Sequence, residues 1–139
     1  MITKDEIQEL LYSTETYRVE RTTSTGDMDK FQEAICAFAN DLPNSRKNGY
    51  LILGANDNGT LSGLKVTDDL LKKIAAIRSN GNILPIPVMS VDRFQFPEGD
   101  LLVAEVSPSD LPPVRYRGRT FIRIGPRRDI ATEAEERIL

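Results

Sequence analysis

A run of arginines near the C-terminal end of the chain is the feature best suited to chemistry with a ligand. Residues 111–128, LPPVRYRGRTFIRIGPRR, hold six arginines and no acid, so the net charge of −3 divides into +6 here and −9 elsewhere. Arginine binds phosphate through planar, bidentate hydrogen bonds, and aromatic rings stack on bases. Because Tyr116 and Phe121 lie among the arginines, the segment predicts nucleic-acid contact. The residues expected to bind are Arg115, Arg117, Arg119, Arg123, Arg127 and Arg128.

The same segment also has a plainer interpretation. Its arginines could form a solvated strand face that is neutralised by this protein's own acids or by a partner protein, because the rest of the chain is so acidic. The sequence leaves both interpretations open.

Composition excludes several classes of active site. The chain has no histidine and one cysteine. This excludes an internal disulfide, Cys/His zinc sites and any general base or triad built on histidine, so a metal would need carboxylate ligands. Gly54, Gly59 and Gly63 lack the Gly-Lys-Ser/Thr of a P-loop and are assigned to turns and close packing. Cys36 is predicted to be a small core residue.

The chain is expected to form one globular domain over its 139 residues. Its N-terminus, MITKDEIQELL, has acids where a signal peptide needs a basic and then an apolar stretch, and its apolar runs are too short to span a membrane. These features favour a cytoplasmic location and no membrane partner.

Local patterns predict two helices and two strands in the N-terminal part of the chain. Thr3 followed by Glu6 is a capping-box pattern, and Asp27 is a suitable N-cap for a second amphipathic helix. In chain order the expected elements are a helix over Lys4–Tyr12, a strand over Glu15–Thr22, a helix from Asp27 to Asn40, a polar loop over Asp41–Asn48 and a buried strand over Tyr50–Ala55.

The remainder of the chain is mainly β-like. Asn58-Gly59 predicts a two-residue hairpin turn, with Thr60–Leu64 as the returning strand. Further expected elements are a helix over Val66–Ser79, strands over Val88–Phe96, Leu101–Ser107, Val114–Arg117 and Arg119–Ile124, and a helix over Ala131–Leu139 capped by Thr132. The expected fold class is α+β, a mixed or antiparallel sheet with about three or four helices packed on it.

Six short motifs occur in an order and spacing typical of one family. They are Glu15-Thr16 with Val19-Glu20, Ala37-Phe38-Ala39-Asn40, Gly49 to Gly54, Asp57 to Gly59 with Gly63, Pro112-Pro113-Val114, and Phe121 to Gly125. Each motif is weak alone. Together, in register over most of the chain, they make it resemble the Schlafen AlbA_2 domain family.

The resemblance implies an α+β domain named for a proposed similarity to Alba nucleic-acid-binding proteins. Such domains occur in many bacterial chains described as transcriptional regulators or helicase-related proteins, usually N-terminal to other modules such as winged helices. For this chain it implies a nucleic-acid-binding domain of a transcriptional regulator, formed by the N-terminal part of a longer protein. The expected partner is DNA or RNA, with no cofactor.

The resemblance also implies candidate catalytic residues. Animal Schlafen relatives include ribonucleases that cleave transfer and ribosomal RNA with three clustered acids. The matching residues are Glu15 and Glu20 in the first strand and Asp57 near the turn, as catalytic groups and as ligands of Mg²⁺ or Mn²⁺. Glu15 and Glu20 are five positions apart, so sharing a metal requires Glu15 to precede the strand or a bulge between them. The alternative is three surface carboxylates in salt links to Arg18, Arg21 or Lys30.

Two family positions have open roles. Arg123, in the family motif Ile-Arg-Ile-Gly, suits a buried pairing with a carboxylate as well as ligand binding. Asn40 could cap its helix or face the same cleft as Asp57, with packing as the default.

This chain also departs from the family pattern. Arg21 and Thr22 follow Glu20, where the family commonly has a phenylalanine and then a lysine. The polar loop at 41–48 is longer than the family's Asn-Thr-Gly-Gly link and is expected to reshape one face near the acids.

The sequence therefore predicts a nucleic-acid-binding domain that uses residues 115–128. A metal-dependent endoribonuclease is the enzymatic alternative. A protein-interaction or oligomerisation module, for example a homodimer, is the third.

Overall fold

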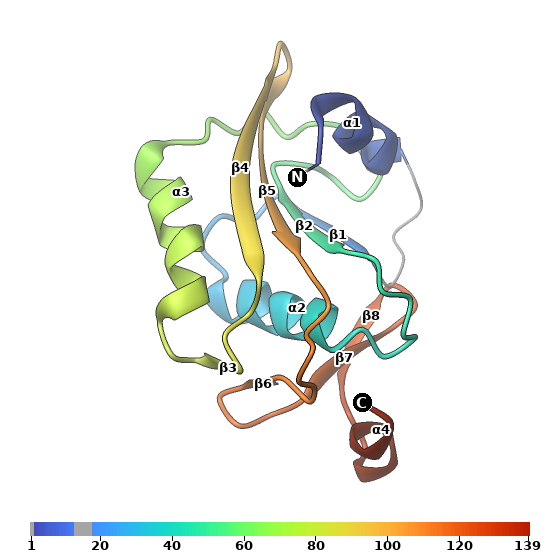
Figure 1. Cartoon of the computed structure of the whole chain (residues 1–139). Helices are drawn as coiled ribbons and strands as arrows, with labels where there is room; N and C mark the ends of the chain where they lie inside the picture. Colours follow the sequence, from blue (N-terminus) through green and yellow to red (C-terminus); the bar gives the residue numbers. More distant parts are fainter. Residues whose placement is uncertain (1, 13–17) are drawn as a thin grey trace.

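A four-stranded mixed sheet forms the centre of the computed structural model, which describes residues 2–12 and 18–139 (Figure 1). Its strands lie in the order β1 (Val19–Thr22), β2 (Gly49–Leu53), β5 (Gly99–Val106) and β4 (Met89–Phe96). β1 and β2 are parallel, whereas β5 is antiparallel to both of its neighbours. Parallel neighbours need a crossover connection, which contains helix α2 (Met28–Asn40). The predicted α+β class is confirmed.

Both faces of the sheet are buried, because its central strands alternate between two apolar clusters. On β2, Leu51 and Leu53 belong to the cluster under α2 and α3 (Asp68–Ala75), whereas Tyr50 and Ile52 belong to the cluster under α1 (Lys4–Tyr12). Strand β5 alternates in the same way. The sheet is therefore a middle layer, with α1 and α3 on opposite sides (Figure 1).

Side-chain caps fix where the helices begin. The Thr3 hydroxyl accepts from the Glu6 amide at 3.2 Å, while a Glu6 carboxylate oxygen accepts from the Thr3 amide at 3.1 Å. Asp27 caps α2 by accepting from the Lys30 amide at 3.1 Å, and Thr132 starts α4 (Glu133–Ile138) with a capping box. The starts predicted for these three helices are confirmed. None of the helices in the described residues is long and apolar enough to cross a membrane.

Two small antiparallel strand pairs lie outside the main sheet and pack near α2. Strand β3 (Ile83–Leu84) pairs with β6 (Arg115–Tyr116), and β7 (Phe121–Ile124) pairs with β8 (Arg127–Ile130). Figure 1 shows them at the lower edge of the molecule, with α4 beyond them.

Asn40, in the last turn of α2, holds the chain segments that lead into these pairs. Its Nδ2 donates to the carbonyls of Val114 (2.9 Å) and Phe121 (2.7 Å), and its Oδ1 accepts from the Val114 amide (2.6 Å). Asp41, with φ of 45°, is the residue that ends the helix in the left-handed conformation. The default role of Asn40 in packing is therefore confirmed.

The prediction of a two-residue hairpin after β2 is wrong in two respects. Residues 60–64 form no strand, and a single isolated bridge joins Ala55 to Leu61. The turn also has three residues instead of two, because the Asn56 amide bonds to the Thr60 carbonyl and the Gly59 amide to the Asn56 carbonyl (2.8 and 2.9 Å). Gly59, with φ of +88°, takes the left-handed position of such a turn.

Other boundaries shift less. The described part of the first predicted strand is Val19–Thr22, and Glu15 lies outside the described residues. The predicted helix over Val66–Ser79 divides into α3, capped by Thr67, and a 3₁₀ turn, η1 (Ala76–Ser79). Strand β8 was not predicted.

Cys36 is buried in the core, as its pattern predicted. Its Sγ lies 3.2 Å from the Val114 carbonyl oxygen, and burial raises the pKa of the thiol to about 11. A thiol with this pKa is almost entirely protonated at neutral pH, so Cys36 is a packing residue and not a nucleophile.

Candidate functional site

The arginines of residues 111–128 fall into two groups, because the chain turns sharply after β6. Arg117 and Gly118, with φ of 48° and 80°, form a two-residue turn, across which Tyr116 and Arg119 exchange backbone hydrogen bonds of 2.8 and 3.0 Å. Before the turn, β6 pairs with β3, and after it β7 pairs with β8. The segments predicted as strands over Val114–Arg117 and Arg119–Ile124 are therefore joined by one isolated bridge, between Tyr116 and Arg119.

The first group, Arg115, Arg117 and Arg119, surrounds this turn and is partly neutralised by acids of the same chain. Arg115 pairs with Glu136 of α4 at 2.9 Å, and Arg117 lies 3.8 Å from Asp29 of α2. Arg119 is exposed and forms no ion pair within the described part of the chain. Arg115 and Arg117 therefore fit the plainer interpretation, in which acids of the same chain neutralise the arginines.

Tyr116 fixes the position of Arg117. The Arg117 guanidinium lies over the Tyr116 ring, 5.4 Å from its centre, and the Tyr116 hydroxyl donates to Asp29 at 2.5 Å. Burial, together with this hydrogen bond to a carboxylate, raises the pKa of Tyr116 to about 12. Tyr116 therefore stays a neutral donor, and its ring is not free to stack on a base.

The second group, Arg123, Arg127 and Arg128, lies on the β7–β8 hairpin, and Arg123 is not a surface residue. Its side chain is 2% exposed and its Nη1 lies 2.5 Å from Glu20 Oε1. Its Nη2 donates to the carbonyls of Val19 and Pro126, both at 3.1 Å. The expectation that Arg123 binds nucleic acid is wrong for this geometry, because a buried guanidinium cannot reach a phosphate in solvent. The alternative of a buried pairing with a carboxylate is the one observed.

Arg128 extends this pairing toward the surface. Its Nε lies 3.3 Å from Glu20 Oε1, and its Nη1 lies 2.7 Å from Glu33 Oε1. Arg127, its neighbour, is exposed and forms no ion pair with any described residue. Glu20 is therefore held between one buried and one half-buried arginine.

A surface cavity of about 410 Å³ brings two of the three predicted acids together. Four basic and two acidic side chains line it, with one proline: Glu20, Arg21, Lys30, Asp57, Pro126, Arg127 and Arg128. Glu20 is 6% exposed, and its Oε2 is buried without a hydrogen-bond partner among the described residues, whereas Asp57 is exposed. The predicted third member, Glu15, lies outside the described residues.

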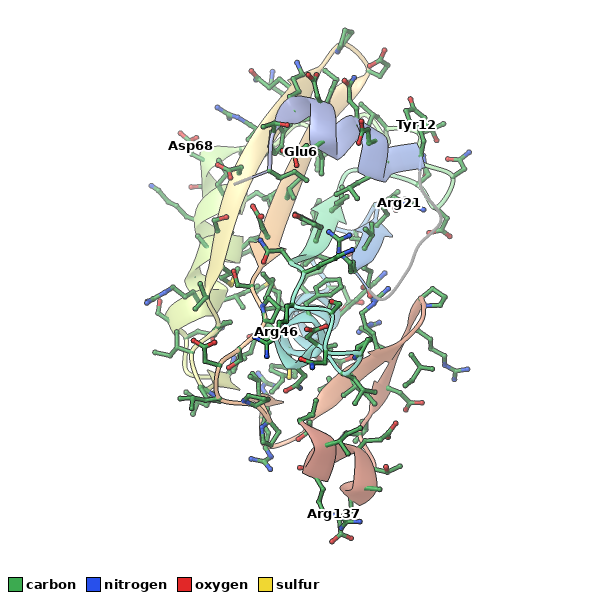
Figure 2. All side chains as sticks on the ribbon, turned by 45° about the vertical axis from the view of Figure 1, so that its right-hand side comes forward. Glu6, Tyr12, Arg21, Arg46, Asp68 and Arg137 are labelled. Carbon is green, nitrogen blue, oxygen red and sulfur yellow. The ribbon has the colours of Figure 1, made fainter. Side chains whose placement is uncertain are left out.

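Arg21 is a site residue that the sequence did not predict. It is 4% exposed, and its Nη1 donates to the carbonyls of Leu10 and Leu11, while its Nη2 donates to the Asp57 carbonyl at 3.0 Å. Carbonyls at a helix C-terminus lack partners within the helix, so Arg21 caps α1 and ties the turn at Asp57 to it. Figure 2 shows Arg21 close to the end of α1 that carries Tyr12. The departure of Arg21 from the family pattern is the signal that could have identified it.

Lys30 is the other unpredicted residue of this cavity. It lies in the first turn of α2, and its Nζ donates to the Thr22 hydroxyl at 3.3 Å. A lysine at the start of an amphipathic helix carries no sequence signal of its own, because this is an ordinary solvent-facing position.

Comparison with known proteins agrees with this fold. The family model described as Schlafen, AlbA_2 matches residues 15–132. A comparison with curated proteins finds no match. Among solved structures, the N-terminal domain of a protein named as related to the ATP-dependent DNA helicase RecG, from Nitrosomonas europaea, is 26% identical with a TM-score of 0.56. The match covers 79% of this chain and 76% of that one.

A second solved structure, from Corynebacterium diphtheriae, has the same fold at lower similarity. It is 17% identical with a TM-score of 0.54, and the match covers 85% of this chain but only 22% of that longer one. The family model covers most of the present chain, including the acids, the glycine turn and both arginine groups. The chain belongs to the Schlafen AlbA_2 family.

Proposed function

We propose that this chain is a nucleic-acid-binding domain of a transcriptional regulator. The observation that carries the proposal is the set of exposed arginines on β6, on the turn that follows it and on β8: Arg115, Arg117, Arg119 and Arg127. The name of the Nitrosomonas europaea protein, which refers to a DNA helicase, supports the same class of ligand.

The acids that already pair with Arg115 and Arg117 do not prevent phosphate binding. Glu136 and Asp29 have side chains that are 35% and 69% exposed, so they regain most of their hydration when they are displaced. Ion pairs in such positions are worth only about 0–1 kcal/mol. A phosphate, which accepts two hydrogen bonds from one guanidinium and releases counterions on binding, can replace them at small cost.

Replacement of Arg115, Arg117 and Arg119 by alanine is expected to weaken binding by about tenfold or more at low salt. The slope of log affinity against log salt concentration should become less steep by about two to three units. Each phosphate contact that is lost lowers the number of counterions released on binding by about one. Fluorescence anisotropy with labelled DNA and RNA across a salt series measures both quantities.

The matched control is replacement of Lys72, Lys73 and Arg78 by alanine, which removes the same charge from α3 and η1. It should lower affinity much less. Equal losses would assign the binding to net charge alone, and no binding by the unaltered domain at low salt would contradict the proposal.

A metal-dependent endoribonuclease is a second candidate, favoured by the cavity that Glu20 and Asp57 share. Glu20 Oε1 is committed to Arg123 and Arg128, so Oε2 is the oxygen that could bind a divalent ion. No group of three possible metal ligands occurs among residues 2–12 and 18–139, so Glu15 would have to complete the set. With Glu15, Glu20 and Asp57 as ligands, bound Mg²⁺ or Mn²⁺ would supply Lewis acidity for phosphodiester hydrolysis.

Asp57→Asn is the variant that tests this candidate. Asp57 is exposed and its carboxylate forms no ion pair with any residue of 2–12 and 18–139, so the fold should be unaffected while Mn²⁺-stimulated cleavage of structured RNA falls to background. Asp69→Asn, an exposed acid on α3, is the control and should cleave normally. Undiminished cleavage by Asp57→Asn would remove Asp57 from the site.

A further inference from the structure

A second cavity, of about 370 Å³, lies beside the turn at Arg117-Gly118, called the arginine turn below. It is lined by Gly81, Asn82, Leu84, Arg115, Arg117 and Gly118, and it shares no residue with the cavity at Glu20. We propose that this second cavity binds one unpaired nucleotide, so that the domain prefers single-stranded nucleic acid. This inference rests on the proposed nucleic-acid-binding function and names its ligand class.

The cationic side of this cavity is preorganised for a phosphate. The Arg115 guanidinium is held by Glu136, and the Arg117 guanidinium is held by Asp29 and by the Tyr116 ring. Both arginine side chains are still about half exposed, at 46% and 63%. Two guanidinium groups that are partly fixed but accessible lose less rotamer freedom when they bind a ligand.

The apolar side of the cavity distinguishes a nucleotide from a free phosphate. Leu84 is 56% exposed, although its neighbour Ile83 in the same two-residue strand is 1% exposed. An exposed leucine next to two arginines offers the face of a base an apolar contact, which a phosphate alone cannot use. In a duplex the faces of the bases are covered by stacking, so this contact requires an unpaired base.

Asn82 supplies a hydrogen-bond acceptor whose orientation is set by the core. Gln32, which is 3% exposed, donates through Nε2 to the Met28 carbonyl (3.1 Å) and the Tyr116 hydroxyl (3.4 Å). Its Oε1 therefore accepts, from Asn80 Nδ2 at 2.9 Å and from Asn82 Nδ2 at 3.2 Å. With Nδ2 committed, Asn82 Oδ1 is the atom left to accept from a donor on a base.

The two walls of the cavity are joined through the backbone. The Arg117 amide donates to the Asn82 carbonyl at 2.8 Å, and β3 pairs with β6 through Leu84 opposite Arg115. The backbone of the apolar and cationic walls therefore keeps its spacing without a ligand, and binding requires only that a phosphate replace Glu136 and Asp29 at the two guanidinium groups.

The test compares a short single-stranded oligonucleotide with the duplex of the same sequence, as DNA and as RNA, by fluorescence anisotropy. Leu84→Ser should weaken single-strand binding by about fivefold, through loss of one apolar contact, and leave duplex binding unchanged. Ile86→Ser is the matched control, because Ile86 is 52% exposed two residues away and does not line the cavity. It should change neither affinity.

The outcomes separate this inference from the proposed function. Equal single-strand affinities for Leu84→Ser and the unaltered protein, or equal losses for single strand and duplex, would overturn the nucleotide site while leaving nucleic-acid binding intact. Absence of binding to every oligonucleotide by the unaltered protein would overturn the proposed function, and this inference with it.

Discussion

Glu20→Ala is expected to lower the free energy of unfolding by about 3–5 kcal/mol, which is the usual cost of removing one partner from a buried ion pair. The remaining partner, Arg123, is 2% exposed and would lose the carboxylate with which its Nη1 is paired. Arg128 would lose its contact with Glu20 as well, and the β7–β8 hairpin would lose its ion pairs with Glu20 of β1. Urea denaturation followed by circular dichroism measures this change.

Glu33→Ala is the control for Glu20→Ala, because Glu33 also pairs with Arg128 but is 29% exposed. It should cost less than about 1 kcal/mol. Replacement of both Glu20 and Arg123 by methionine should recover most of the stability, since no buried charge is then left without a partner. Equal losses of unfolding free energy in Glu20→Ala and Glu33→Ala would contradict the prediction that the buried Glu20–Arg123 pair is the costlier one to break.

The same cost affects any test of catalysis at Glu20. A Glu20 variant that has lost RNA cleavage could be inactive because the hairpin has detached, so its loss would not identify a catalytic acid. Asp57→Asn avoids this problem because Asp57 is exposed.

Asn40→Ala is expected to destabilise the protein by about 3 kcal/mol, because it removes three buried hydrogen bonds to the backbone: one to the Val114 amide and one each to the Val114 and Phe121 carbonyls. Asn40 is 4% exposed, so water cannot easily replace the amide. Hydrogen exchange should show faster exchange at Val114 and neighbouring amides, in addition to the lower unfolding free energy.

Asn48→Ala provides the comparison for Asn40. Asn48 is half-buried and its Nδ2 makes one side-chain hydrogen bond, to Glu105 at 2.8 Å, so its loss should cost about 1 kcal/mol. Asn40→Asp should resemble Asn40→Ala, because a carboxylate cannot donate to the two carbonyls. Full stability of either Asn40 variant would show that the segments leading into β6 and β7 are held by other contacts.

Elements that depend on nearby residues could be predicted from the sequence. The starts of α1, α2 and α4 follow from Thr3, Asp27 and Thr132, whose hydrogen-bond partners lie three residues away. β2 and β5 could be predicted because they are short apolar runs buried on both faces. The returning strand after β2 could not, because β propensity alone does not supply a partner for residues 60–64.

The site was predictable in part, and mainly through the family. The placement of Glu20 and Asp57 around one cavity is what the resemblance implied. Of the six arginines, Arg123 alone had a sequence signal for burial, its Ile-Arg-Ile-Gly motif, and that motif left ligand binding open as well. The partner that buries Arg123 is Glu20, 103 positions away, and the pairing of β3 with β6 joins segments that are about 30 residues apart.

Helix α4 has no buried residue, and Glu136 ties it to the domain through Arg115 (2.9 Å) and the Thr120 hydroxyl (3.2 Å). A ligand that takes Arg115 from Glu136 also weakens the attachment of the helix. By thermodynamic reciprocity, whatever holds α4 in place must lower the affinity of that ligand by the same factor. Through Arg115, ligand binding at the arginine turn and attachment of α4 to the domain are thermodynamically coupled.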